Sequence, residues 1–215
     1  MIFRQWLTLN PEQIPMSMPL SERIEEYIQP GIKVLDIGCG CGRFYEFFAS
    51  RGCVYYGIDI NSSAIGIARK SHKKRCEFQV CNAEKTGFPG EFFDILVAQG
   101  TLACMDLEGR KKSIDEIKRI GKEGSILHLT ELDLISDDTF YQAQKQKTGE
   151  YGTVTARADG SILDYATHHF SRKELLELLG EDLEILVEEH PLLTTRNGNQ
   201  YPSHRMIVRK GRSRV

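Results

Sequence analysis

Short apolar runs alternate with helical apolar patterns along the first two thirds of the chain. Five apolar runs bounded by glycine or polar residues predict buried strands, at residues 32–37, 54–60, 76–81, 92–98 and 125–132. Between them, apolar residues recur at spacings of three and four and predict helices, at residues 43–50, 61–68 and 107–120. Because strands that alternate with helices are typical of a parallel sheet covered on both faces, the sequence predicts an α/β fold.

The last third of the chain has a different pattern. Residues 136–147 are polar and compatible with a helix, and the Asp159-Gly160 turn signal predicts a hairpin within residues 151–169. Ser171 with Glu174 three residues later forms a capping-box pattern ahead of four leucines and predicts a further helix. Two apolar runs joined by a short polar link then predict adjacent antiparallel strands, at residues 183–193 and 203–209.

Length and composition favour one domain. The chain has 215 residues, of which 40% are hydrophobic and 27% charged, which is sufficient for a single core. We expect one domain over residues 1–215, with an N-terminal arm and helix at 1–30 and a substrate-side insertion at 133–170. The arm carries Phe3, Trp6, Leu7 and three prolines, and it either closes over the ligand site as a flap or packs on the sheet.

Charge and cysteine usage narrow the class of protein. The formal net charge of −2 indicates no broad basic face for nucleic acid. No apolar run reaches the roughly 20 residues that a membrane span needs, and the N-terminus has no signal-peptide pattern. The six cysteines contain no C-x-x-C pair, so we expect free thiols and a cytoplasmic protein without a membrane partner.

The segment Asp36–Gly42, with the sequence DIGCGCG, carries the strongest chemical signal. It follows the first strand, where glycines permit a tight turn and close approach of a ligand to the backbone. A dinucleotide site is the main alternative, but its fingerprint is G-x-G-x-x-G, whereas here the spacing is G-x-G-x-G and Arg43 follows. Asp36 would repel a pyrophosphate and attract a cation. Since S-adenosylmethionine (SAM) carries a positive amino group and a sulfonium, the segment favours SAM.

Two further polar positions follow the next strands. Asp59 ends the second strand, where an acid can accept hydrogen bonds from both ribose hydroxyls, although it could instead cap the next helix. Asn82 follows the third strand, where its side-chain oxygen can accept from an adenine amino group while the Ala83 backbone N–H meets a ring nitrogen. The alternative for Asn82 is a simple turn.

Together these segments resemble the class I SAM-dependent methyltransferases. The resemblance covers residues 30–132 and rests on VLDIGCGCG (34–42), GIDI (57–60), CNAE (81–84), FFDILVAQGTL (92–102) and IKRIGKEGSILHLTE (117–131). It implies three α/β/α layers around a mostly parallel, doubly wound, seven-stranded sheet. The implied strand order is 3-2-1-4-5-7-6 with strand seven antiparallel, which agrees with the two adjacent C-terminal strands predicted above.

The resemblance also implies a cofactor site. SAM would leave as S-adenosylhomocysteine, and the glycine loop would contact its methionyl part, with Asp36 near the amino group. Asp59 would hold the ribose and Ile60 would lie against the adenine. The implied site residues are Asp36, Gly38, Cys39, Gly40, Gly42, Asp59, Ile60, Asn82, Ala83, Gln99 and Gly100. The chain departs from the family at Asn82, where many relatives carry Asp, and at Gln99–Leu102 in the zone that meets the acceptor.

No catalytic residue is required by the chemistry. Methyl transfer from a sulfonium is an in-line displacement with a good neutral leaving group, so positioning and desolvation supply much of the rate. A general base is needed only where the acceptor must lose a proton. Candidates in the divergent regions are Tyr141, Tyr151, His168, His169 and Arg196. Adjacent residues on a strand face opposite sides, so His168-His169 is a poor metal pair and we expect no metal site.

Three functions remain open from the sequence. The first is methylation of a small molecule. The second is methylation of tRNA or protein, to which basic clusters at residues 69–75 and 205–212 could contribute phosphate contacts. The third is a non-catalytic module that binds SAM or a dinucleotide.

Overall fold

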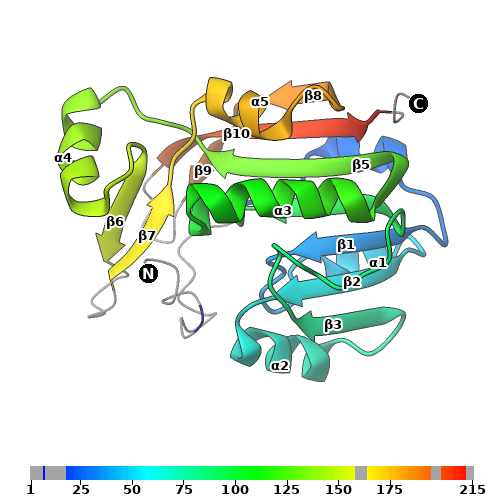
Figure 1. Ribbon diagram of the computed structural model, residues 1–215. Helices are drawn as coiled ribbons and strands as arrows, with labels where there is room; N and C mark the ends of the chain where they lie inside the picture. Colours follow the sequence, from blue (N-terminus) through cyan, green and yellow to red (C-terminus); the bar gives the residue numbers. More distant parts are fainter. Residues whose placement is uncertain (1–6, 8–17, 158–163, 195–199, 212–215) are drawn as a thin grey trace.

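The computed structural model describes residues 7, 18–157, 164–194 and 200–211 and contains a twisted central sheet flanked by helices (Figure 1). Within this part of the chain the sheet has eight strands in the order β3-β2-β1-β4-β5-β10-β8, with β9 paired to β10. Its strands are β1 Lys33–Ile37, β2 Val54–Asp59, β3 Cys76–Val80, β4 Phe93–Gln99, β5 Gly121–Leu132, β8 Leu183–Glu189, β9 Leu192–Thr194 and β10 Gln200–Lys210.

The topology confirms the predicted order. Strands β3, β2, β1, β4 and β5 are parallel to their neighbours, whereas β10 is antiparallel to both β5 and β8. With β8 and β10 as the sixth and seventh core strands, this is the 3-2-1-4-5-7-6 arrangement. The antiparallel β10 lies between two strands that run the same way, so the carboxyl ends of β1, β2, β4, β5 and β8 share one edge of the sheet.

Helices cover both faces of the sheet and form two separate apolar cores. The helices are α1 Tyr45–Ala49, α2 Ser62–Ser71, α3 Leu107–Ile120, α4 Asp138–Thr148 and α5 Arg172–Leu179, with 3-10 helices η3 Glu22–Tyr27 and η4 Leu102–Cys104. One core joins α3 and α5 to alternate residues of β5 such as Leu127 and Leu129. The other joins η3, α1 and α2 to Ile126 on the opposite side of the same strand. Residues alternate across a strand, so one sequence run supplies both cores.

Two predicted helix starts are confirmed. The Asn61 side chain caps α2 by accepting the backbone N–H groups of the second and third helical residues at 3.0 and 3.1 Å. Ser171 caps α5 by accepting from the Glu174 N–H at 3.2 Å. The Glu174 carboxylate, however, lies 2.8 Å from Nε2 of His168, so only half of the predicted capping box forms.

Several elements differ from the sequence prediction in their bounds or type, and the run predicted as one strand at residues 183–193 divides into β8 and β9. Helix α1 begins at Tyr45 instead of residue 43 because residues 41–44 form a turn. The helix predicted in the N-terminal region is the 3-10 helix η3, Glu22–Tyr27. Strand β5 begins at Gly121, four residues before the predicted start, because Gly121 is extended and pairs with Phe93 across a register shift. Each difference reflects local backbone geometry that apolar periodicity does not report.

The segment between β5 and α5 forms its own small unit beyond the carboxyl ends of the central strands (Figure 1). It contains α4 and the antiparallel pair β6 Thr153–Arg157 and β7 Asp164–His168, which confirms the predicted hairpin. The hairpin turn at residues 159–160 lies outside the described residues, as do the N-terminal arm apart from Leu7 and residues 18–30, and the predicted turn at 197–198. Strand β7 packs against η4, directly after β4.

Two expectations about chemistry are tested by the fold. All six cysteines are free thiols, two of them buried and four half-buried, as predicted. No helix within the described ranges combines the length and the apolarity that a membrane crossing requires.

Candidate cofactor-binding site

The glycine loop is held against the end of β2 by backbone hydrogen bonds. The N–H groups of Gly38 and Cys39 both donate to the Ile58 carbonyl oxygen, at 2.8 and 3.0 Å. The Gly40 N–H donates to Oδ2 of Asp59 at 2.8 Å. The loop after β1 and the acid that ends β2, which are separated by about twenty residues in sequence, therefore form one unit as the sequence predicted.

Gly38 and Gly40 in this loop both have a left-handed backbone, but they differ in the space around the missing side chain. Gly38 has φ 73°, and a Cβ there would lie 2.4 Å from Oγ1 of Thr101, whose hydroxyl donates to the Ile37 carbonyl oxygen at 2.7 Å. Gly40 has φ 55°, but a Cβ built on it would meet no heavy atom within 4 Å. Gly38 is thus constrained by packing against the segment after β4, whereas Gly40 faces open space where a ligand can approach the backbone.

Asp36 is a fully buried acid with one unsatisfied oxygen. Its Oδ2 accepts a hydrogen bond from the Tyr55 hydroxyl at 2.6 Å, and Oδ1 has no hydrogen-bond partner among the described residues. Burial raises the pKa of Asp36 to about 6, against the lowering effect of Arg43 and of the Tyr55 hydrogen bond. A buried acceptor without a donor costs about 1–3 kcal/mol. A cationic ligand group would remove that cost.

Asp59 organises the loop and does not cap α2. Its Oδ1 accepts from the Asn61 N–H at 2.8 Å, while Asn61 itself is the helix cap. Burial raises the pKa of Asp59, and the N–H groups of Asn61 and Gly40 oppose that rise. A carboxylate can accept about four hydrogen bonds, so Asp59 retains the capacity to accept from a ribose hydroxyl. The next residue, Ile60, is 43% exposed, which leaves an apolar surface beside the acid.

The segment after β3 shows the turn that was the alternative interpretation of Asn82. The Asn82 side-chain oxygen accepts from the Glu84 N–H at 3.0 Å, and its carbonyl oxygen accepts from the Lys85 N–H at 3.2 Å. Asn82 is exposed and Ala83 is buried. The turn fixes the orientation of Asn82 and leaves one side-chain lone pair for a ligand donor.

The end of β4 is tied to the glycine loop and to the N-terminal segment. The Gln99 carbonyl oxygen accepts from Nη2 of Arg43 at 2.9 Å. The Gln99 side-chain amide lies 3.2 Å from Nδ1 of His128, and Nε2 of His128 accepts from the Ser21 N–H at 3.0 Å. Burial lowers the pKa of His128 to about 3, so this imidazole is neutral. Gly100 follows in a left-handed conformation, with φ 64°.

Glu131 is a buried acid beside the candidate site that the sequence analysis did not identify. It is fully buried in β5, and its two carboxylate oxygens accept the N–H groups of Leu102 and Ala103 at 2.9 and 3.2 Å. Burial raises the pKa of Glu131 to about 8, although these N–H groups oppose the rise. Glu131 thereby fixes the backbone of the segment that follows β4. An acid within the apolar run 125–132 was the available signal.

Most of the catalytic candidates form hydrogen bonds with other side chains in or next to the insertion. His168 is buried, with Nδ1 2.8 Å from the Thr153 hydroxyl in addition to its contact with Glu174, and His169 Nδ1 lies 2.8 Å from the Tyr141 hydroxyl. The Tyr151 hydroxyl donates to Asp138 at 2.9 Å. Burial lowers the pKa of His169 to about 4. The two histidines have separate partners, and Arg196 lies outside the described residues.

The geometry defines a class of protein. A glycine loop, the buried carboxyl group of Asp36, the half-buried carboxyl group of Asp59 and an exposed apolar residue meet at the carboxyl edge of a doubly wound sheet. Such folds bind nucleoside cofactors at this edge. The unsatisfied oxygen of Asp36 and the open space at Gly40 fit a ligand that is cationic next to its nucleoside.

Comparison with known proteins identifies the family. A family model described as a methyltransferase domain matches residues 35–129. An uncharacterised methyltransferase of Synechocystis is 31% identical over 153 residues, which cover 69% of this chain and 72% of that protein. A SAM-dependent methyltransferase structure from Methanosarcina mazei superposes with a TM-score of 0.84 and 32% identity, covering 91% of this chain and all of that one.

A ubiquinone/menaquinone biosynthesis C-methyltransferase of Bordetella avium is 32% identical over 117 residues, covering 51% of this chain and 44% of that protein. The chain spans about half the length of several of the curated relatives that it matches. The chain therefore belongs to the class I SAM-dependent methyltransferases, and its cofactor is SAM.

Proposed function

We propose that the protein transfers the methyl group of SAM to a small-molecule acceptor. The observation that carries the proposal is Oδ1 of Asp36, a buried acceptor without a partner at the edge where the cofactor binds. In this proposal Asp36 faces the methionyl amino group, and Gly38, Cys39, Gly40 and Gly42 line the methionyl part. Asp59 accepts from the ribose hydroxyls, Ile60 lies against the adenine, and Asn82 and Ala83 contact its edge. Gln99 and Gly100 complete the methionyl side.

The reaction is a single in-line displacement. A lone pair or carbanion of the acceptor forms the new bond to the methyl carbon as the sulfur–methyl bond breaks. The bonding pair stays on sulfur, which gives neutral S-adenosylhomocysteine, and a proton leaves the acceptor where its nucleophilic atom carried one. The protein contributes alignment and exclusion of water. Glu131 serves this alignment through the backbone of residues 102 and 103.

A small acceptor is supported by the surroundings of the site and by the relatives. The insertion with α4, β6 and β7 lies beyond the carboxyl ends of the strands (Figure 1), and we assign residues 133–170 to the acceptor side. Two curated relatives carry names of small-molecule C-methyltransferases, one acting in ubiquinone/menaquinone biosynthesis and one on sterols. An acceptor of that size suits a site closed by one short insertion.

For the alternative of a tRNA methyltransferase, three side chains of the two basic clusters are already occupied within the fold. Arg69 donates to the Phe78 carbonyl oxygen at 2.9 and 2.7 Å, and Arg205 is buried with Nη1 3.1 Å from Glu189. Lys210 donates to the Gly121 carbonyl oxygen at 2.8 Å. Side chains occupied in this way contribute less to phosphate contacts. Lys70, Lys73, Lys74 and Arg75 of the first cluster are exposed, so tRNA is kept as a substrate in the test below.

Calorimetry with three ligands tests the proposal. We expect micromolar binding of SAM and S-adenosylhomocysteine and none of NAD. Asp59→Ala should weaken both adenosyl ligands at least tenfold, whereas Asp182→Ala, a change at an exposed acid near the far end of β8, should leave both unchanged. Tight NAD binding without a response to the adenosyl ligands would refute the proposal.

The acceptor is then sought by following S-adenosylhomocysteine release with a panel of quinol, sterol and other small nucleophiles. Turnover with a small molecule supports the proposal. Turnover that appears only with tRNA or a protein substrate would assign the second function. SAM binding without turnover on any of these substrates would favour the non-catalytic module.

A further inference from the structure

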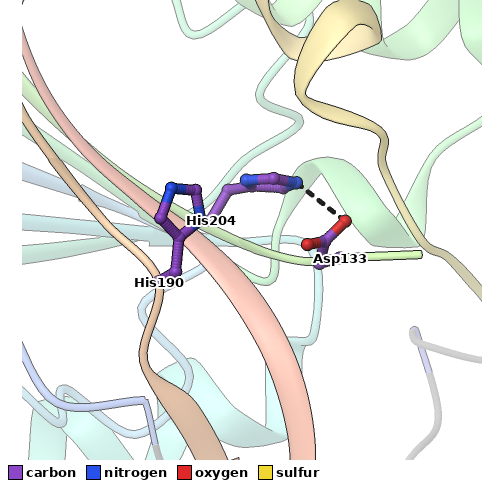
Figure 2. A group of neighbouring side chains, drawn as sticks. All are labelled: Asp133, His190 and His204. Atoms are coloured by element: carbon purple, nitrogen blue, oxygen red, sulfur yellow. Dashed lines mark ion pairs between the residues drawn. The ribbon is translucent and has the colours of Figure 1, made fainter. Parts of the chain in front are cut away.

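Three side chains with metal-binding chemistry lie close together near the carboxyl ends of β5 and β8 (Figure 2). Asp133 directly follows β5, His190 directly follows β8, and His204 lies in β10 opposite Glu131. One ligand atom of each side chain lies within 4.8 Å of those of the other two. Their sequence separations of 57 and 14 residues explain why no motif revealed them.

His204 is the central member of this group. It is 4% exposed, and neither ring nitrogen has a hydrogen-bond partner among the described residues. Its Nε2 lies 2.9 Å from Oδ1 of Asp133, although the angles of a hydrogen bond are not met. A buried imidazole with unsatisfied nitrogens is costly, and a metal ion bound by one nitrogen offsets that cost.

The distance between Nε2 of His204 and Oδ1 of Asp133 suits two ligands of one metal ion. Nitrogen and oxygen ligands bind first-row metals at about 2.1 Å, so two ligands in neighbouring positions at 90° lie about 3.0 Å apart. The distance of 2.9 Å between His204 and Asp133 matches this value. The His190 ring stands edge-on to the His204 ring, with centroids 5.3 Å apart, and its side chain is 56% exposed. A side-chain rotation can therefore bring His190 to a third position.

The neighbouring charges are compatible with a cation. Glu188 lies 3.7 Å from Nε2 of His190 and can orient that ring, as carboxylates commonly do for metal-bound imidazoles. Arg172 also pairs with Glu188, at 2.7 and 2.9 Å, and so holds the carboxylate in place. Asp133 is 29% exposed at its side chain, which gives an ion a route from solvent.

We propose that Asp133, His190 and His204 bind one divalent first-row transition-metal ion. Two imidazoles and one carboxylate suit Zn²⁺, Co²⁺, Fe²⁺ or Mn²⁺, whereas Mg²⁺ and Ca²⁺ prefer all-oxygen sites. Three protein ligands leave positions open for water or for an oxygen or nitrogen of a bound molecule. Asp133 lies three residues past Thr130, the register partner of Gln99, which places it about 10 Å further along the direction of β5.

The test is a Co²⁺ titration of chelator-treated protein, followed by absorption spectroscopy and calorimetry. We expect one equivalent of Co²⁺ with a visible d–d spectrum, displaced by Zn²⁺, and a higher melting temperature in the presence of either ion. His204→Asn and Asp133→Asn should each lower the affinity for Co²⁺ at least a hundredfold. Asp182→Asn removes an exposed acid near the other end of β8 and should bind Co²⁺ like the parent.

His190→Ala keeps the test decisive if the buried His204 variant fails to fold, because His190 is exposed and its loss spares the core. This variant should retain SAM binding and lose at least tenfold in Co²⁺ affinity. The proposal is overturned if the parent binds neither Co²⁺ nor Zn²⁺. It is equally overturned if folded His190→Ala and Asp133→Asn bind Co²⁺ as tightly as Asp182→Asn. These metal readouts do not depend on methyl transfer.

Discussion

Arg43 joins the glycine loop to the end of β4, because its Nη2 donates to the Gln99 carbonyl oxygen across 2.9 Å. We place that oxygen beside the methionyl amino group of SAM, which it would contact together with Asp36. The two cationic donors would compete for one acceptor, so we expect Arg43 to release Gln99 when the cofactor binds. Arg43 is exposed and can move without disturbing the core.

The affinity for SAM should fall at acidic pH. Burial raises the pKa of Asp36 to about 6, so the carboxyl takes up a proton in the ligand-free protein below that pH. A cationic amino group favours the ionised form, and binding must then displace the proton, which weakens affinity by up to about tenfold per pH unit below the pKa. Calorimetry between pH 8 and pH 5 checks this, and a constant dissociation constant would contradict the role of Asp36.

Asp36→Asn is the control for this pH dependence. The variant should bind SAM more weakly at pH 8 and show a smaller change between pH 8 and pH 5. Asp59 also has a raised pKa and acts in the same direction, so any pH dependence that remains in Asp36→Asn reports Asp59.

Arg43→Met should raise the pH below which the affinity for SAM begins to fall. The guanidinium lowers the pKa of Asp36, and its removal leaves burial and the charge of Asp59 to raise it. Methionine preserves much of the apolar stem without the charge. The midpoint of the pH profile of SAM affinity should therefore rise above that of the parent. An unchanged or lower midpoint would show that Arg43 does not act on Asp36.

Gly40→Ala and Gly38→Ala should separate binding from stability. A methyl group at Gly40 meets no other atom, so the stability cost of Gly40→Ala is about 1–2 kcal/mol, the cost of the left-handed conformation. The same methyl group occupies the space through which the cofactor approaches the backbone, so the affinity for SAM should fall at least tenfold. A methyl group at Gly38 collides with Thr101 and should lower the melting temperature more. Adding Thr101→Ala to Gly38→Ala should recover part of that loss. Equal melting temperatures for the two single variants would contradict this division.

The free energy of unfolding of Glu131→Gln, relative to that of the parent, should increase as the pH rises. The folded pKa of Glu131 is raised from 4.5 to about 8, so the folded state holds a proton that the unfolded state has released. The parent thus loses stability between pH 4.5 and pH 8, and the neutral amide does not. Thermal melts at pH 5 and pH 8 measure the difference. Glu131→Ala leaves two buried N–H groups without an acceptor and should be less stable than Gln at both pH values.

The sequence by itself determined the fold class and the core of the cofactor site. Apolar periodicity is a local property, so it located the five parallel strands and the helices between them. It missed the turn at residues 41–44, the 3-10 type of η3 and the division of residues 183–193 into β8 and β9. The glycine loop and Asp59 follow consecutive parallel strands, and parallel strands bring their carboxyl ends to one edge. Chain order alone therefore placed Gly40 beside Asp59.

Only the tertiary structure decided how polar groups far apart in sequence are paired. It gave Asp36 one satisfied and one unsatisfied oxygen, assigned Glu131 to the backbone after β4, and brought Asp133 to His204. It also showed His168 and His169 in separate hydrogen bonds. Such pairings depend on burial and on the register between β5 and β10, and neither is encoded in the spacing of residues along the chain.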